Sequence, residues 1–130
     1  MNEKKIIQIA ANTNFYGIKN MYPLKTRAKN KLCGDEIIIE IEENFKNIRF
    51  ESRSCVFTQA SAAILAKNFS EMYRYGLKNI LTYIKKKLNG DKVNIPFKSK
   101  ELELLICKEN KNRKECITLP FEAIINIIND

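Results

Sequence analysis

Four cysteines, Cys33, Cys55, Cys107 and Cys116, are the residues of this 130-residue chain best suited to chemistry. The thiolate form of cysteine both binds metals and attacks electrophiles. The chain has no histidine, which excludes His-dependent catalytic triads, His-ligated metal sites and HExxH proteases. No two cysteines form a Cys-x-x-Cys pair, which excludes a zinc ribbon or a thioredoxin-type motif. Metal chemistry here must therefore use cysteine and carboxylate side chains.

The first two cysteines stand at points where the backbone is expected to change direction. Cys33 is followed by Gly34 and Asp35; glycine permits an unusual backbone angle, so the thiol and the carboxylate could reach one ion from a bent loop. Cys55 stands where a strand is expected to end and a helix to begin. The positive potential at a helix N-terminus lowers the pKa of a thiol and favours thiolate.

The other two cysteines differ from each other. Cys116 is expected just before a helix, beside Arg113 and Lys114, and these cations also favour thiolate. Cys107 ends the apolar run Leu-Leu-Ile at 104–106, so we expect it to be a small buried hydrophobic residue with a structural role.

Strand and helix patterns suggest how these residues are positioned. Residues 36–43 and 46–52 alternate in polarity, with Ile37, Ile39 and Ile41 on one face, and Glu40 and Glu42 on the other. This pattern and the short link between the two segments predict an antiparallel hairpin. A third strand is expected in the N-terminal segment or just before Cys55, and residues 12–32 are predicted to be an irregular basic loop.

The rest of the chain favours helices. They are expected over residues 2–11, 56–67, 70–88 and 101–107, and from Thr118 onward. Ser54, Ser70, Ser99 and Thr118 are the expected N-caps, and Pro120 is placed in the first turn of the last helix. A strand over 101–107 is the alternative there, and 108–115 is expected to be a charged loop. The pattern predicts one α+β domain over residues 1–130, with about three antiparallel strands and helices packed on one face of the sheet.

Composition limits the class of protein. Hydrophobic residues make up 45% and charged residues 29%, which is typical of a folded globular chain. No run approaches the ~20 apolar residues of a membrane helix, and no signal peptide is evident. We therefore expect a cytoplasmic protein without a membrane partner, in which cysteines bind metal or react rather than form disulfides. The net charge of +8 also admits a basic nucleic-acid-binding domain, but the few aromatic residues beside cations, such as Tyr22 and Tyr83, give it little support.

Three segments resemble the three cysteine motifs of the U-type iron–sulfur scaffold family, which includes the NifU N-terminal domain, IscU and SufU. They are residues 30–35 (NKLCGD), 50–62 (FESRSCVFTQASA) and 113–119 (RKECITL), in this order. The resemblance covers roughly residues 20–128 and implies a SufE/IscU-like fold.

Several positions depart from the family's motifs. Lys31 replaces a usual proline, Ser52 and Ser54 replace glycines, and Glu115 replaces the histidine of the IscU branch. Residues 108–112 do not match the Leu-Pro-Pro-Val-Lys stretch that docks a specialised Hsp70 chaperone in that branch, so no Hsp70-type partner is expected. We interpret Glu115 as a solvated charge, with a second interpretation as a hydrogen-bond acceptor near the site.

Two further features are similar to the SufU branch, some members of which act as zinc-dependent sulfur acceptors. They are the long span from Cys55 to Cys116 and the arginine at 113.

By resemblance, Cys33, Asp35, Cys55 and Cys116 converge as the ligands of a metal or of a transient [2Fe–2S] cluster. Three thiolates and a carboxylate also suit tetrahedral zinc, and the single hard carboxylate is the ligand expected to make a cluster easier to release. The resemblance implies a scaffold, not an enzyme, that receives sulfur from a cysteine desulfurase and passes its cluster to apo iron–sulfur proteins. Cys116 or Cys33 would accept the persulfide sulfur. The alternative is a zinc-bound persulfide acceptor, a sulfurtransferase.

Overall fold

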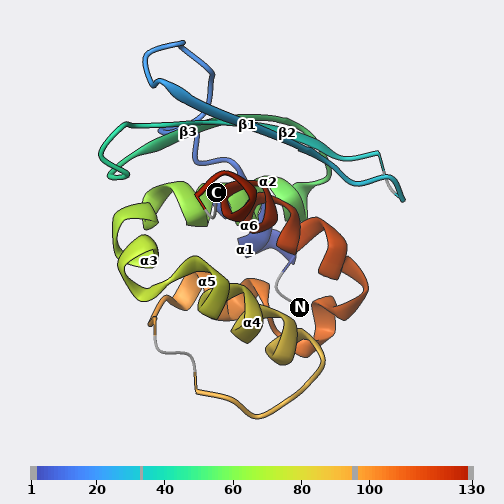
Figure 1. Ribbon diagram of the computed structural model, residues 1–130. Helices are drawn as coiled ribbons and strands as arrows, with labels where there is room; N and C mark the ends of the chain where they lie inside the picture. Colours follow the sequence, from blue (N-terminus) through green and yellow to red (C-terminus); the bar gives the residue numbers. More distant parts are fainter. Residues whose placement is uncertain (1–2, 33, 95–96, 129–130) are drawn as a thin grey trace.

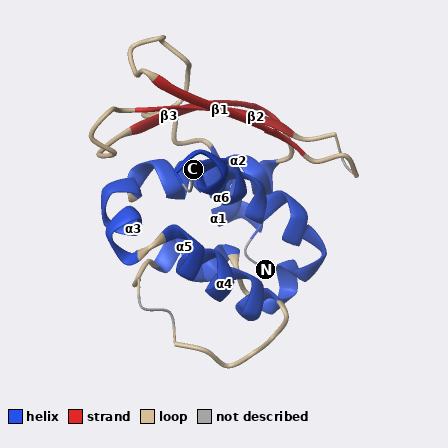
Figure 2. Cartoon of the chain, viewed as in Figure 1, coloured by secondary structure: helices blue, strands red, loops and turns tan. Residues whose placement is uncertain are grey.

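The computed structural model describes residues 3–32, 34–94 and 97–128 of the chain. Three strands form one antiparallel sheet in the order β1-β2-β3, and helices pack on one of its faces (Figures 1 and 2). The strands are β1 (Leu24–Lys29), β2 (Glu36–Ile41) and β3 (Ile48–Arg53). The α-helices are α1 (Glu3–Ala10), α2 (Val56–Lys67), α3 (Phe69–Tyr75), α4 (Leu77–Leu88), α5 (Lys100–Leu105) and α6 (Lys114–Ile128). The predicted α+β class and the helical cover on one face are confirmed.

Alternating burial explains the central strand. Ile37, Ile39 and Ile41 are completely buried against the helices, as the period of two predicts. In the register of the sheet, Ile39 pairs with Phe50 and Ile41 with Ile48, so each cross-strand pair adds apolar surface to the same core. Helices α2 and α6 lie directly beneath this face, and α4 packs against α6 on the side away from the sheet (Figure 1).

The outer face of the sheet is partly covered by the segment before β1. Glu40, predicted on this face, is nevertheless completely buried. Its carboxylate accepts hydrogen bonds from the backbone N–H groups of Lys19 (3.1 Å) and Asn20 (3.0 Å). The guanidinium of its cross-strand neighbour Arg49 donates to the carbonyl oxygens of Tyr16 (2.7 Å) and Gly17 (2.9 Å). These bonds fix the N-terminal segment across β2 and β3.

The third strand, β1, lies in the N-terminal segment, which was one of the two places expected for it. The prediction that all of residues 12–32 form a loop was therefore wrong. In β1 the exposed positions are Lys25, Arg27 and Lys29, and the half-buried ones include Thr26 and Ala28. Of the inward side chains only Leu24 is large and apolar, so the strand carries no strongly apolar stripe. The strand is stabilised by its pairing with β2 and its contact with α6 instead of by an apolar stripe of its own.

The helix predicted over 70–88 is broken in two. Gly76 has a φ of 97°, which is a conformation that favours glycine, and it separates α3 from α4. The predicted N-cap Ser70 lies inside α3, and Asn68 is the residue at the cap position. The predicted apolar stripe from Leu77 to Leu88 holds on α4, but Tyr73 is 40% exposed.

Helix α2 has the predicted bounds, but its N-cap residue differs from the prediction. Its N-cap position is taken by Cys55 instead of Ser54, without a side-chain cap bond. The Ser54 hydroxyl instead donates to the Ser52 hydroxyl, at 3.0 Å.

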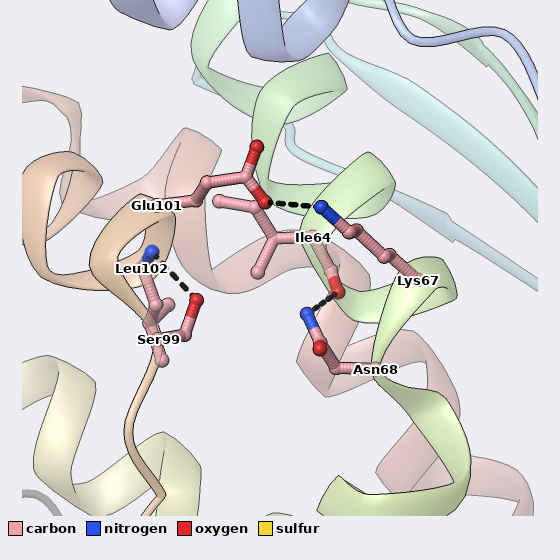
Figure 3. A network of polar contacts seen from close by, with 6 residues as sticks. All are labelled: Ile64, Lys67, Asn68, Ser99, Glu101 and Leu102. Atoms are coloured by element: carbon pink, nitrogen blue, oxygen red, sulfur yellow. Dashed lines mark hydrogen bonds and ion pairs between the residues drawn. The ribbon is translucent and has the colours of Figure 1, made fainter.

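The helix favoured for residues 101–107 is confirmed, and the strand given as its alternative is not formed; α5 covers Lys100–Leu105. Ser99 is the N-cap of α5, as predicted, and its hydroxyl accepts from the Leu102 N–H at 3.2 Å (Figure 3). An ion pair of 3.2 Å between Lys67 and Glu101 links the end of α2 to the start of α5. The Asn68 side chain donates to the Ile64 carbonyl at the end of α2, at 2.9 Å.

The predicted 108–115 loop is a 3₁₀ helix, Lys108–Arg113, that leads directly into α6. Helix α6 therefore begins at Lys114, and Thr118 is not its cap. Pro120 lies in the helix interior instead of the first turn. None of the helices in the described part of the chain combines the length and the apolar composition needed to cross a bilayer.

Candidate metal centre

Three of the four predicted ligands come together from three different elements. Asp35 precedes β2, Cys55 is the N-cap of α2, and Cys116 lies in the first turn of α6. Their sulfur and oxygen ligand atoms all lie within 4.8 Å of one another. Asp35 and Cys116 are buried and Cys55 is half-buried. The fourth predicted ligand, Cys33, lies outside the described residues, two positions before Asp35 in the chain.

A tight turn between β1 and β2 holds Asp35 in place. The Asn30 N–H donates to the Asp35 carbonyl at 2.7 Å, and the Gly34 N–H donates to the Asn30 carbonyl at 2.8 Å. The Asn30 side chain accepts from the Leu32 N–H at 2.9 Å. Gly34 has a φ of 75°, so glycine suits this turn for the conformational reason expected from the sequence.

The Asp35 carboxylate is buried among hydrogen-bond donors. Its Oδ2 accepts from the Thr58 hydroxyl at 2.7 Å, and its Oδ1 accepts from the Cys55 backbone N–H at 3.3 Å. Burial acts to raise the pKa of Asp35, but hydrogen bonds from Thr58, from both thiols and from the Cys55 backbone outweigh it, so the pKa lies below its usual 3.8. Asp35 is therefore an anion at neutral pH, ready to bind a cation.

Cys116 departs from the expectation of a thiolate. Burial raises the pKa of its thiol well above the usual 9.0, and the neighbouring Cys55 and Asp35 raise it further. The Arg113 guanidinium, predicted to favour thiolate, lies over the Phe57 ring at 5.3 Å from its centroid. Without a metal the Cys116 side chain is a neutral thiol, and a bound cation would have to displace its proton.

Thr58 is a site residue that the sequence analysis did not single out. It is fully buried, and its hydroxyl reaches Asp35 Oδ2, the Cys116 carbonyl oxygen (3.0 Å) and the Cys55 sulfur (3.8 Å). Its position three residues after Cys55 was the available signal, because residues three apart share one face of a helix.

Cys107 is not part of this group. It stands at the N-cap of the 3₁₀ helix, where the Asn110 side-chain amide donates to its sulfur at 3.7 Å. Its neighbours Leu105 and Ile106 are buried, but Cys107 itself is only half-buried, so the expected full burial was wrong. Glu115 is exposed, in keeping with its interpretation as a solvated charge.

The separation of the three donors suits a small metal centre. Zinc–sulfur bonds of about 2.3 Å place neighbouring sulfur ligands of a tetrahedral site about 3.8 Å apart. Donors within 4.8 Å therefore need to close by only about 1 Å around one ion. The same donor types also hold iron–sulfur clusters.

Solved structures share this arrangement of strands and helices. A nitrogen-fixing NifU-like protein (N-terminal) from Brucella abortus superposes with a TM-score of 0.77 and 17% identity, over 97% of this chain and 90% of the other. A putative iron–sulfur cluster assembly scaffold protein for the SUF system from Fervidobacterium islandicum AW-1 gives 0.73 and 19%, over 92% and 90% of the two chains. The chain has the fold of these two proteins. This confirms the fold that the three cysteine motifs implied.

Two further comparisons carry no functional description. A hypothetical protein of known structure matches over the whole of both chains, with a TM-score of 0.78 and 18% identity. An uncharacterized protein of Borreliella burgdorferi is 29% identical over 122 residues, which cover 92% of this chain and 76% of that protein. No protein-family model matches the chain. Because one fold serves many functions, the function has to be argued from the site.

Proposed function

We propose that this protein is a cytoplasmic scaffold on which a [2Fe–2S] cluster is assembled and from which it passes to apo iron–sulfur proteins. The observation that carries the proposal is the group of Asp35, Cys55 and Cys116, whose ligand atoms lie within 4.8 Å of one another on a scaffold-protein fold. Cys33 would supply the third thiolate. The role is to hold and release a cargo, so the protein would not be an enzyme.

The mixed ligand set suits a cargo that must leave. A carboxylate is a harder ligand than a thiolate and binds soft iron–sulfur centres less tightly. Asp35 also has hydrogen-bond partners in the metal-free protein, Thr58 and the Cys55 backbone. Its carboxylate is therefore stabilised when the cargo is absent, which favours release.

Sulfur would arrive from a cysteine desulfurase by thiol–persulfide exchange. Cys33, or Cys116 once a bound cation has displaced its proton, attacks as thiolate the outer sulfur of the desulfurase persulfide and forms a new sulfur–sulfur bond. The original sulfur–sulfur bond breaks, and the desulfurase cysteine leaves as thiolate. Each transferred sulfur then needs two electrons from a reductant to become sulfide, which joins ferrous iron in the cluster.

A second candidate, a zinc-bound sulfur acceptor, is favoured by the compactness of the group. Zinc would be held by Cys55, Cys116, Asp35 and Cys33, and it would supply positive charge that keeps the thiols deprotonated. The donor set fits this ion, because two thiols and an anionic carboxylate lie close to the spacing that a tetrahedral ion requires. In that case the protein would carry persulfide sulfur and keep its zinc.

Both candidates need the same residues, so the first experiment tests the site. Cys33→Ser, Cys55→Ser and Cys116→Ser should each weaken the binding of Zn²⁺ and Fe²⁺ severely, as measured by metal analysis and chelator competition. Cys107→Ser is the matched control and should keep wild-type metal content. Wild-type stoichiometry and affinity in all three site variants would show that the ligands lie elsewhere, and loss of metal in the control would make Cys107 a ligand.

A further inference from the structure

The Thr58 hydroxyl has one hydrogen and two oxygen acceptors within reach. Asp35 Oδ2 is 2.7 Å away and the Cys116 carbonyl oxygen is 3.0 Å away. The residue is completely buried, so water does not compete for these bonds. One side chain of α2 thus contacts the two other elements that supply site residues.

Pro120 explains why the Cys116 carbonyl accepts from a side chain. In a regular helix this carbonyl would accept from the N–H four residues later, but the residue there is Pro120, which has no N–H. The Thr58 hydroxyl supplies a donor to this carbonyl, and the Ser61 hydroxyl donates to the next carbonyl, that of Ile117, at 2.6 Å. These two buried hydroxyls on α2 bind the first turn of α6.

The two acceptors differ in charge. The carboxylate oxygen Oδ2 of Asp35 lies 2.7 Å from the hydroxyl and the Cys116 carbonyl oxygen 3.0 Å, and hydrogen bonds to carboxylates are shorter and roughly twice as strong as those to neutral acceptors. The Thr58 hydrogen is therefore shared between the two acceptors in the metal-free protein, with the stronger bond to Asp35 Oδ2, in keeping with the shorter distance. Oδ1 accepts the longer bond, 3.3 Å, from the Cys55 N–H, and it is therefore the oxygen more easily given to a metal.

We propose that Thr58 is the positioning residue of the metal centre: its hydroxyl anchors Asp35 by Oδ2 and leaves Oδ1 to bind the metal. This inference rests on the proposed function, because it assigns Thr58 a role toward the same site. When Asp35 is removed, the hydroxyl turns to the Cys116 carbonyl and stays paired. Its contact with the Cys55 sulfur is long, at 3.8 Å, so Thr58 acts on metal binding mainly through Asp35, and on folding also through α6.

The test compares zinc affinity in variants of the two buried hydroxyls. Thr58→Val keeps the shape of the side chain without the hydroxyl, and it should weaken Zn²⁺ binding about 10- to 100-fold, as loss of a group that orients a metal ligand does. Thr58→Ser restores the hydroxyl and should bind zinc as the wild type does. Ser61→Ala removes the neighbouring bond between α2 and α6 without touching Asp35, so it should lower resistance to urea but leave zinc affinity unchanged.

A double-mutant cycle separates positioning from structural support. In an Asp35→Ala background, Thr58→Val should cause no further loss of zinc affinity, although it still lowers resistance to urea. If Thr58→Val proves too unstable to purify, Thr58→Ala gives the same comparison with a smaller side chain. The inference would be overturned if Thr58→Val bound zinc with wild-type affinity, or if it lost the same affinity with and without Asp35. Either result would leave the proposed function intact. If the wild-type protein binds neither Zn²⁺ nor Fe²⁺, the proposed function fails and this inference fails with it.

Discussion

Replacing Asp35 by alanine should destabilise the metal-free protein, even though a buried carboxylate is usually costly. The change removes the hydrogen bonds to a charged acceptor, of which those from the Thr58 hydroxyl and the Cys55 N–H involve the stronger donors. Such bonds contribute about 1.5–3 kcal/mol each. The Thr58 hydroxyl can turn to the Cys116 carbonyl at 3.0 Å, so the structure recovers part of one bond. The carboxylate's desolvation is also relieved.

These effects leave a net loss of about 2 kcal/mol in the free energy of unfolding at neutral pH. For a chain of this size that corresponds to a melting temperature lower by roughly 6–10 °C. Glu122→Ala is the matched control, because Glu122 is an exposed carboxylate on α6, and its stability should stay within about 0.5 kcal/mol of wild type.

The difference should also depend on pH with a definite sign. Because the pKa of Asp35 lies below its usual 3.8 in the folded protein, its contribution is fully present above that value. The contribution disappears as the pH falls through the folded pKa. Urea unfolding with a chelator present, at pH 7 and at successively lower pH, measures the gap between wild type and Asp35→Ala. An Asp35→Ala protein equal to or more stable than wild type at pH 7 would refute the reasoning, because the hydrogen bonds would then not outweigh burial.

Three further outcomes are expected. Gly76→Ala should lower stability by about 1–3 kcal/mol in urea unfolding, because φ is 97° and the added carbon would lie 3.1 Å from Asn79 Nδ2. Unchanged stability would contradict the positive φ of Gly76 between α3 and α4. Ser99→Ala should lose about 1 kcal/mol through its helix cap, whereas Ser70→Ala, at the predicted cap that α3 does not use, should change stability little; equal losses would contradict the assignment of caps. Zinc affinity should rise with pH between 6 and 9, up to about tenfold per pH unit for each proton displaced, because the pKa of the Cys116 thiol is raised. Chelator competition at several pH values measures the zinc affinity. A flat profile would mean that Cys116 is already ionised or is not a ligand.

The sheet and the order of elements could largely be predicted from local patterns. The isoleucines of β2 and the alternation in β3 predict a hairpin because each strand buries one face. Strand β1 escaped the pattern because, of its inward residues Leu24, Thr26 and Ala28, only the first is large and apolar. The position of Pro120 was mispredicted for another reason: proline favours a first turn, and only donors from a different helix, Thr58 and Ser61, make an interior position acceptable.

The site could be predicted through its motifs better than through its electrostatics. The motif residues Asp35, Cys55 and Cys116 come together in the structure, although they are far apart in the chain. The ionisation of Cys116 was mispredicted, because charges adjacent in sequence were weighed and burial was not visible. Thr58 was missed because its one sequence signal, the position three residues after Cys55, does not show which groups its hydroxyl contacts.

The most direct test of the central claim is whether the protein builds and releases a cluster. Metal-free protein is incubated without oxygen with a cysteine desulfurase, cysteine, Fe²⁺ and a reductant, and the visible spectrum is followed before an equal amount of an apo iron–sulfur acceptor is added. The account predicts charge-transfer absorption that develops on the scaffold and then moves to the acceptor, with slower transfer for Asp35→Ala if the carboxylate is the labile ligand. A protein that takes up persulfide, retains zinc and stays colourless would contradict the scaffold function and establish the sulfur acceptor in its place.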